Sequence, residues 1–201
     1  MKKNVLLIIL LVILLIGVIT FIIIKNYDHN KNADNKTDLE NKKILIVYYS
    51  AQSHTKNVAL KLKEKLNADI FEIEPVDTYT SDDLNWRDNN SRVTKEHNDE
   101  SLRNIELKET KVDNWDEYDI VLIGYPIWWG IAAWPVNTFV KANNFDNKTV
   151  IPFCTSSSSG MGDSGKLLSK ETKTGIWKDG YRFSSNATDK DIDAFIDSIK
   201  K

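Results

Sequence analysis

Three short segments of this 201-residue chain carry side chains that could bind a ligand. Residues 50–55 read Ser-Ala-Gln-Ser-His-Thr, residues 125–130 read Tyr-Pro-Ile-Trp-Trp-Gly, and residues 155–160 read Thr-Ser-Ser-Ser-Ser-Gly. Hydroxyl and amide groups just before a helix suit a phosphate, because the first N–H groups of a helix attract an anion. Two adjacent indoles suit a planar ring, since exposed aromatic surface is costly unless something flat covers it.

Each segment also has a simpler interpretation. Ser53 or Thr55 could be an ordinary helix cap, and the two indoles could pack on the next helix and on the sheet edge. The serine-rich segment could be a linker. The elements that precede the three segments decide between these alternatives.

The hydrophobic pattern predicts alternating strands and helices. A continuous apolar run at 44–49 is typical of a strand that is covered on both faces, and the apolar residues in 58–66 recur at helical spacing. Further strands are expected at 69–74, 120–123, 149–154 and 181–183. Pro152 argues against the strand at 149–154, the fourth along the chain, because proline has no N–H to donate. Further helices are expected at 136–142, 166–170 and 192–199, the last with a Thr188–Asp191 capping box. Residues 77–115 form a polar, partly helical excursion. The prediction is a doubly wound α/β sandwich with a central parallel sheet.

In such a sheet, ligands bind at the carboxyl ends of the strands, beside the point where the strand order reverses. All three candidate segments follow predicted strands. We therefore expect them to meet at one edge of the sheet.

Several other classes of site are excluded. The glycine pattern at 160–165 resembles a dinucleotide motif, but it follows the fourth strand rather than the first. A phosphate-binding loop would need Ser or Thr at Leu167. The single cysteine, Cys154, rules out an intramolecular disulfide and a cysteine-rich metal site. The three histidines lack the spacing of metal ligands, so no metal is expected.

The N-terminal residues predict a membrane anchor. Residues 5–24 are uninterrupted by charge and long enough, as a helix, to cross the hydrocarbon layer. The expected organisation is an anchor at 1–25, a polar tether at 26–41 and a globular domain at 42–201. Lys2 and Lys3 favour a domain on the extracytoplasmic side of the cell membrane. Residues 26–201 carry 24 basic and 29 acidic side chains, a net charge of −5, which argues against binding to nucleic acid.

Together these segments make the chain resemble the flavodoxin family, in the branch that carries G-x-P-I-W-W-G. The resemblance runs from about Lys43 to the C-terminus and is most specific at 124–130. It implies a five-stranded parallel sheet, with noncovalent FMN at its carboxyl edge and electron transfer as the activity. The residues it assigns to the phosphate are Ser50, Gln52, Ser53, His54 and Thr55. Those along the flat ring are Pro126, Ile127, Trp128, Trp129 and Gly130, and those at its other edge are Thr155, Ser156, Ser157, Ser158 and Gly160.

This resemblance leaves three functions open. The first is a membrane-anchored electron carrier whose redox partner is a protein or a quinone. The second is an FMN-dependent NAD(P)H:quinone-type oxidoreductase, and the third is a binding module without flavin. Ser53, Ser157 and Ser158 stand where the family pattern has glycine. If these positions need positive φ, serine costs on the order of 1 kcal/mol at each.

Overall fold

The computed structural model describes residues 17, 19, 20, 39 and 41–200. Lys42–Asp197 form one compact unit. The membrane span predicted at 5–24 and the tether at 26–41 lie almost entirely outside the described residues. Among the described residues, none of the helices is both long and apolar enough to cross a bilayer.

The central sheet has the strand order β2-β1-β3-β5, with β6 and β7 both paired to the outer side of β5. These pairs are parallel, and β4 adds an antiparallel hairpin to the end of β3. The described part thus has seven strands but five parallel positions, as expected. The bounds are β1 (Ile44–Tyr48), β2 (Asp69–Glu72), β3 (Ile120–Trp128), β4 (Ile131–Ala132), β5 (Thr149–Ser156), β6 (Ile176–Trp177) and β7 (Tyr181–Ser184).

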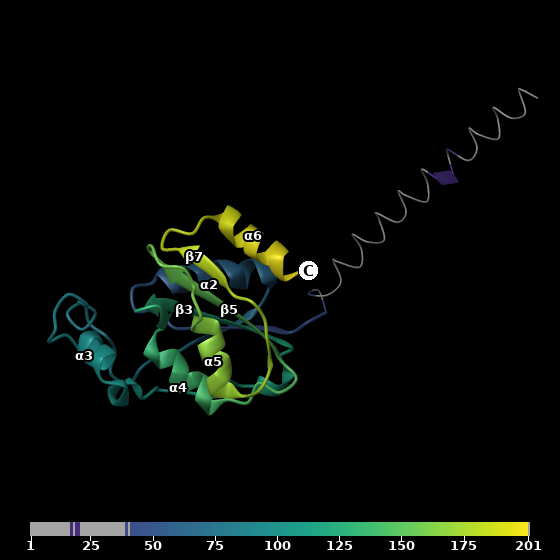
Figure 1. The fold of residues 1–201 in the computed structure, drawn as a ribbon. Helices are drawn as coiled ribbons and strands as arrows, with labels where there is room; N and C mark the ends of the chain where they lie inside the picture. Colours follow the sequence, from purple (N-terminus) through teal and green to yellow (C-terminus); the bar gives the residue numbers. More distant parts are fainter. Residues whose placement is uncertain (1–16, 18, 21–38, 40, 201) are drawn as a thin grey trace, which may run out of the picture. The chain divides into compact units, whose positions relative to one another are not determined.

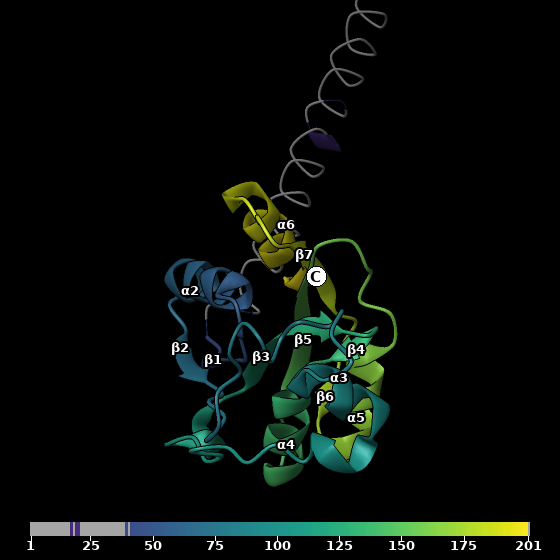
Figure 2. The same ribbon diagram turned by 90° about the vertical axis from the view of Figure 1, so that its left-hand side faces the viewer.

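Helices cover both faces of this sheet (Figures 1 and 2). On one face lie α2 (His54–Leu66) and α6 (Asp189–Ile199). Two ion pairs join these helices, Lys61–Asp189 and Lys65–Asp193. On the other lie α4 (Trp134–Ala142) and α5 (Ser164–Thr172). All five residues of β1 are buried because the strand is central and covered twice. The doubly wound three-layer sandwich is therefore confirmed.

Pro152 lies inside β5, a central strand, although proline cannot donate a ladder hydrogen bond. The structure accommodates it at the break between β6 and β7. Val150 pairs with Trp177 and Phe153 with Tyr181, so Lys178, Asp179 and Gly180 stand opposite only Ile151 and Pro152. Three residues thus face two, and the additional residue interrupts the hydrogen bonding between the strands at the point where Pro152 has no N–H to donate.

The polar excursion between β2 and β3 is partly helical, as predicted. It contains α3 (Arg92–Asn98) and the 3₁₀ turns η1 (Glu100–Arg103) and η2 (Trp115–Glu117). Pro75 and Leu107 pair antiparallel, and the Val76 N–H donates to the Glu106 carbonyl at 2.9 Å. We call residues 75–107, which this pairing closes, the β2–β3 segment. Figure 1 shows α3 projecting beyond the helices that cover the sheet.

The predicted capping box of α6 is also present. The Thr188 N–H donates to the Asp191 carboxylate at 2.8 Å, and the Asp191 N–H donates to the Thr188 hydroxyl at 3.4 Å. These bonds satisfy donors that the first turn of a helix would otherwise leave unpaired. The carboxylate also accepts from the Thr188 hydroxyl at 2.7 Å, and the two bonds that it accepts from Thr188 hold the Asp191 pKa below its usual range.

The close contact between β3 and β5 yields a stability prediction. A Cβ at Gly124 would overlap the Phe153 ring, whereas one at Gly160 would meet no heavy atom within 4 Å. Gly124→Ala should lower the free energy of unfolding by about 1–3 kcal/mol through overpacking. Gly160→Ala, the matched control, should change it by less than about 0.5 kcal/mol. Denaturant titration measures both, and equal midpoints for the two variants would contradict this packing.

A second prediction concerns the single cysteine. Cys154 is fully buried, and burial raises its thiol pKa to about 12. Only the thiolate reacts with alkylating reagents, so the native protein should stay unlabelled at pH 8 for hours. Protein unfolded in guanidinium should take up one label per chain, which mass spectrometry counts. Fast labelling of the native protein would contradict the burial of β5.

Candidate functional site

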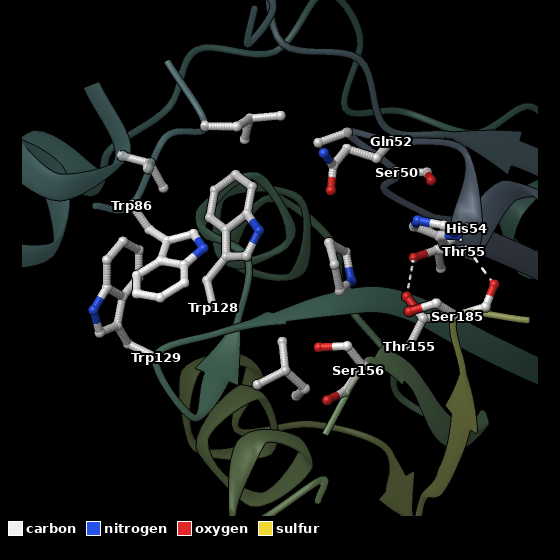
Figure 3. Close-up of a pocket in the computed structure, with 16 residues that line it drawn as sticks. Ser50, Gln52, His54, Thr55, Trp86, Trp128, Trp129, Thr155, Ser156 and Ser185 are labelled. Carbon is white, nitrogen blue, oxygen red and sulfur yellow. Dashed lines mark hydrogen bonds between the residues drawn. The ribbon is translucent and has the colours of Figure 1, made fainter. Parts of the chain in front are cut away.

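The three candidate segments meet in one pocket of about 500 Å³ at the carboxyl ends of β1, β3 and β5. The volume is typical of a site for a small molecule. Predicted residues that line it are Ser50, Gln52, His54, Thr55, Pro126, Ile127, Trp128, Trp129, Thr155, Ser156 and Ser157. Predicted residues that do not are Ser53, Gly130, Ser158 and Gly160. Figure 3 shows the tryptophans at one end and Ser50, His54, Thr55 and Ser185 at the other.

The N-terminus of α2 opens at the polar end of this pocket. Ser53 stands at the N-cap with φ 62°, and within the described chain its side chain makes no capping hydrogen bond. The first turn of α2 contains no acidic residue. The simple capping interpretation of Ser53 is therefore wrong, and the first N–H groups of a 13-residue helix are left for another acceptor.

Two hydrogen bonds fix the side chains around this helix end. The hydroxyls of Thr55 and Thr155 lie 2.8 Å apart, and both residues are buried. The His54 Nδ1 lies 3.0 Å from the Ser185 carbonyl oxygen and donates to it (Figure 3). Thr55 is thus not a cap either, because its hydroxyl connects α2 to the end of β5. These contacts join the start of α2 to the ends of β5 and β7 at the polar end of the pocket.

The second segment is a hairpin rather than a loop. We expected β3 to end at Ile123, but it continues to Trp128, and Trp128 pairs with Ile131 of β4. Trp129 and Gly130 form the two-residue turn, with φ 45° and 81°. Positive φ at both turn residues suits the twist of a hairpin, although asparagine and glycine are the usual choices. Trp129 therefore adopts a left-handed conformation that is costly for an L-residue.

Aromatic contacts hold this hairpin in place. The Trp128 ring lies edge-on to Tyr49, Tyr79 and Trp134, with centroid distances of 5.7, 5.1 and 5.5 Å. Trp129 stacks on His97 at 4.4 Å, with 9° between the ring planes, and remains 39% exposed. The alternative in which the indoles pack on the protein is thus partly correct, but both still line the pocket.

The third segment closes the pocket from the end of β5. The Arg182 guanidinium donates to the Ser156 carbonyl at 2.8 Å, and the Ser156 and Ser159 hydroxyls lie 2.9 Å apart. Of the three serines that stand in glycine positions, Ser53 has positive φ, whereas Ser157 and Ser158 are not in the left-handed region. The backbone cost of serine is therefore confined to Ser53.

The sequence interpretation missed the wall that the β2–β3 segment contributes. Leu84, Trp86 and Val93 line the pocket, and so do Ala51 and Ser185. The signal was present, because these apolar side chains interrupt an otherwise polar stretch. These side chains do not recur at helical or strand spacing, however, so the sequence does not indicate that they face the pocket.

The lining consists mainly of neutral polar and aromatic side chains. His54 is the single titratable group among the pocket residues that the structure describes. The described lining residues include no aspartate, glutamate, lysine or arginine. Hydroxyls and a helix N-terminus at one end, with indoles at the other, suit an amphipathic ligand that has an anionic end and a flat ring.

The Thr55–Thr155 pair gives a prediction at the polar end. Thr55→Val should lower the free energy of unfolding by about 1–3 kcal/mol, because it leaves the buried Thr155 hydroxyl without its partner. The double variant Thr55→Val/Thr155→Val should recover part of this loss, since both polar partners are then absent. Urea unfolding measures the cycle. Strictly additive losses would mean that the two hydroxyls do not interact.

Comparison with known proteins was made on sequence and on structure. The family model described as Flavodoxin matches residues 43–199. A flavoprotein from Bacteroides eggerthii DSM 20697 is 39% identical, with a TM-score of 0.72 over 80% of this chain and 99% of that one. One from Bacteroides uniformis ATCC 8492 is 35% identical, with a TM-score of 0.71 over 77% and 97%.

A more distant structure shares the fold. It is a flavoprotein from Lactobacillus acidophilus NCFM in complex with FMN, 22% identical, with a TM-score of 0.54 over 80% of this chain and 99% of that chain. The comparison with curated proteins found no match.

Proposed function

Since the chain belongs to the flavodoxin family, we propose that it binds FMN noncovalently in the pocket and carries electrons. The cofactor is FMN. The observation that carries the proposal is the difference between the two ends of the pocket. Its polar end suits the phosphate of FMN, and its aromatic end suits the flat ring. FMN supplies the redox chemistry, and the protein supplies binding and electrostatics.

The residues present fit the phosphate end of FMN. The first turn of α2 offers N–H groups that Ser53 does not cap, and Ser50, Gln52 and Thr55 add neutral donors beside it. Because the helix end itself favours a negative charge, a lysine or arginine is not required. His54, the first residue of α2, donates to the Ser185 carbonyl, which keeps the start of α2 against the end of β7.

The ring end of FMN fits the aromatic end of the pocket. Pro126, Ile127, Trp128 and Trp129 come from the end of β3 and its turn, so a regular strand positions them. The Ser156 and Ser157 side of the pocket offers hydroxyl and backbone groups for a polar ring edge. The described residues that line this end are neutral, and the Arg87 guanidinium lies 4.8 Å from the centre of the Trp86 ring.

We also propose that residues 5–24 anchor the protein in the cell membrane and hold the domain on the extracytoplasmic side. The support is the apolar run itself and the lysines before it. The electron partner would then be a membrane quinone or a protein that reaches the same surface.

Titration of the full chain with FMN in mild detergent tests the cofactor. We expect a yellow complex in which the nearby indoles quench flavin fluorescence. A protein that stays colourless in excess FMN would instead be a binding module without flavin. Rapid steady turnover of NAD(P)H without a partner protein would make it an oxidoreductase rather than a carrier.

A charge variant tests the position of the phosphate. Gln52→Glu is isosteric and places a negative charge in the lining beside the N-terminus of α2. We expect FMN to bind roughly fivefold more weakly, a cost of about 1 kcal/mol at low salt, because like charges repel. Riboflavin, which lacks the phosphate, serves as the control and should bind as it does to the unaltered protein. An equal loss for both ligands would contradict this orientation of FMN.

A further inference from the structure

The aromatic end of the pocket has a third tryptophan, which comes from outside the three candidate segments. Trp86 belongs to the β2–β3 segment and lines the pocket together with Leu84 and Val93. Figure 3 shows it at the same end as Trp128 and Trp129. Its side chain is 60% exposed, compared with 39% for Trp129. The Arg87 guanidinium lies 4.8 Å from the centre of this ring, and the part of the indole that stays exposed is apolar surface that a ligand can cover.

The turn that carries Trp86 is held by its own hydrogen bonds. The Asp83 carboxylate accepts from the N–H and the hydroxyl of Thr80, at 2.9 and 2.7 Å. The Asp83 carbonyl accepts from the Val93 N–H at 3.0 Å, and the Asn85 carbonyl accepts from the Asp88 N–H at 2.9 Å. The turn is thus tied to the start of α3, so the position of Trp86 is set by the fold of the segment.

The β2–β3 segment is in turn fixed to the aromatic groups behind the hairpin. The buried Glu96 carboxylate accepts from the Tyr79 hydroxyl at 2.6 Å and from Arg92 Nε at 2.8 Å. The Arg92 guanidinium lies 4.0 Å from the centre of the Tyr79 ring, and Tyr79 itself contacts Trp128. The element that carries Trp86 therefore packs on one of the two tryptophans of the hairpin.

A second set of contacts links the same segment to the other tryptophan. His97 stacks on Trp129, and the Arg103 guanidinium lies 4.6 Å from the centre of the Trp134 ring. Arg103 also donates to the His97 carbonyl at 2.6 Å. Through these contacts Trp86 keeps a defined place relative to both hairpin indoles. Together the three indoles form an aromatic wall at one end of the pocket.

We propose that Trp86 is a residue of the FMN site, whose indole covers the flat ring of the bound ligand. This inference rests on the proposed binding of FMN. The contact would be with the ring and not with the phosphate, because Trp86 lies at the opposite end of the pocket from His54 and Thr55, which begin α2 (Figure 3). The β2–β3 segment, which the sequence presents as a polar excursion, would then be part of the binding site and limit escape of the ligand.

Equilibrium titration of the full chain in mild detergent, with FMN and separately with riboflavin, tests the proposal. Trp86→Ala should weaken both ligands by the same factor, about tenfold or more, as expected for loss of one aromatic stacking partner. Most of the change should appear as faster dissociation. Trp86→Phe should retain most of the affinity. Leu102→Ala is the matched control, since Leu102 lies in η1, is 49% exposed and is not among the described residues that line the pocket, so both ligands should bind unchanged.

The outcomes separate the two proposals. If the unaltered protein binds FMN and riboflavin but Trp86→Ala leaves both dissociation constants within about twofold, Trp86 is not in the site and the function stands. If the variant weakens FMN alone, the indole does not contact the ring, and the inference is again overturned. Failure of the unaltered protein to bind either ligand would overturn both the function and this inference.

Discussion

The parallel pairing of β1, β3 and β5 is the constraint on which the site depends. Tyr48 pairs with Gly124 and Tyr125 pairs with Cys154, so the chain leaves all three strands at the same edge of the sheet. Gly124 lets the β5 ring of Phe153 approach β3 closely, which a side chain would prevent. Buried residues fix this register. The polar and aromatic segments that follow the strands are therefore brought to the same edge of the sheet by the strands themselves.

Much of this arrangement is present in the sequence. The apolar run before Ser50 and the helical spacing after His54 are enough to predict a strand, a loop and a helix, and the structure confirms them. The same alternation predicts the layers and the edge at which the segments meet. These features follow from the spacing of apolar residues along the chain. That spacing reflects which side chains are buried, so it can be recognised in a single sequence.

The features that the sequence did not reveal depend on tertiary contacts. β3 continues past Ile123 because residues 124–126 still pair with β5 and residues 127–128 pair with β4, which returns as a hairpin. Pro152 is tolerated in a central strand because the neighbouring strand is interrupted beside it. The β2–β3 segment packs through scattered contacts such as Glu96 with Tyr79 and His97 with Trp129, which have no repeating pattern along the chain. Residues far apart in sequence determine each of these outcomes.

The left-handed backbone of Trp129 in the hairpin turn lowers the stability of the domain. An asparagine there would fit the left-handed backbone at lower cost, so a designer who optimised folding alone would replace the tryptophan. The same exchange would remove the indole that stacks on His97. Thermal robustness and the aromatic lining of the pocket thus make opposite demands on one position, and a screen for heat-resistant variants would select against a side chain that lines the pocket.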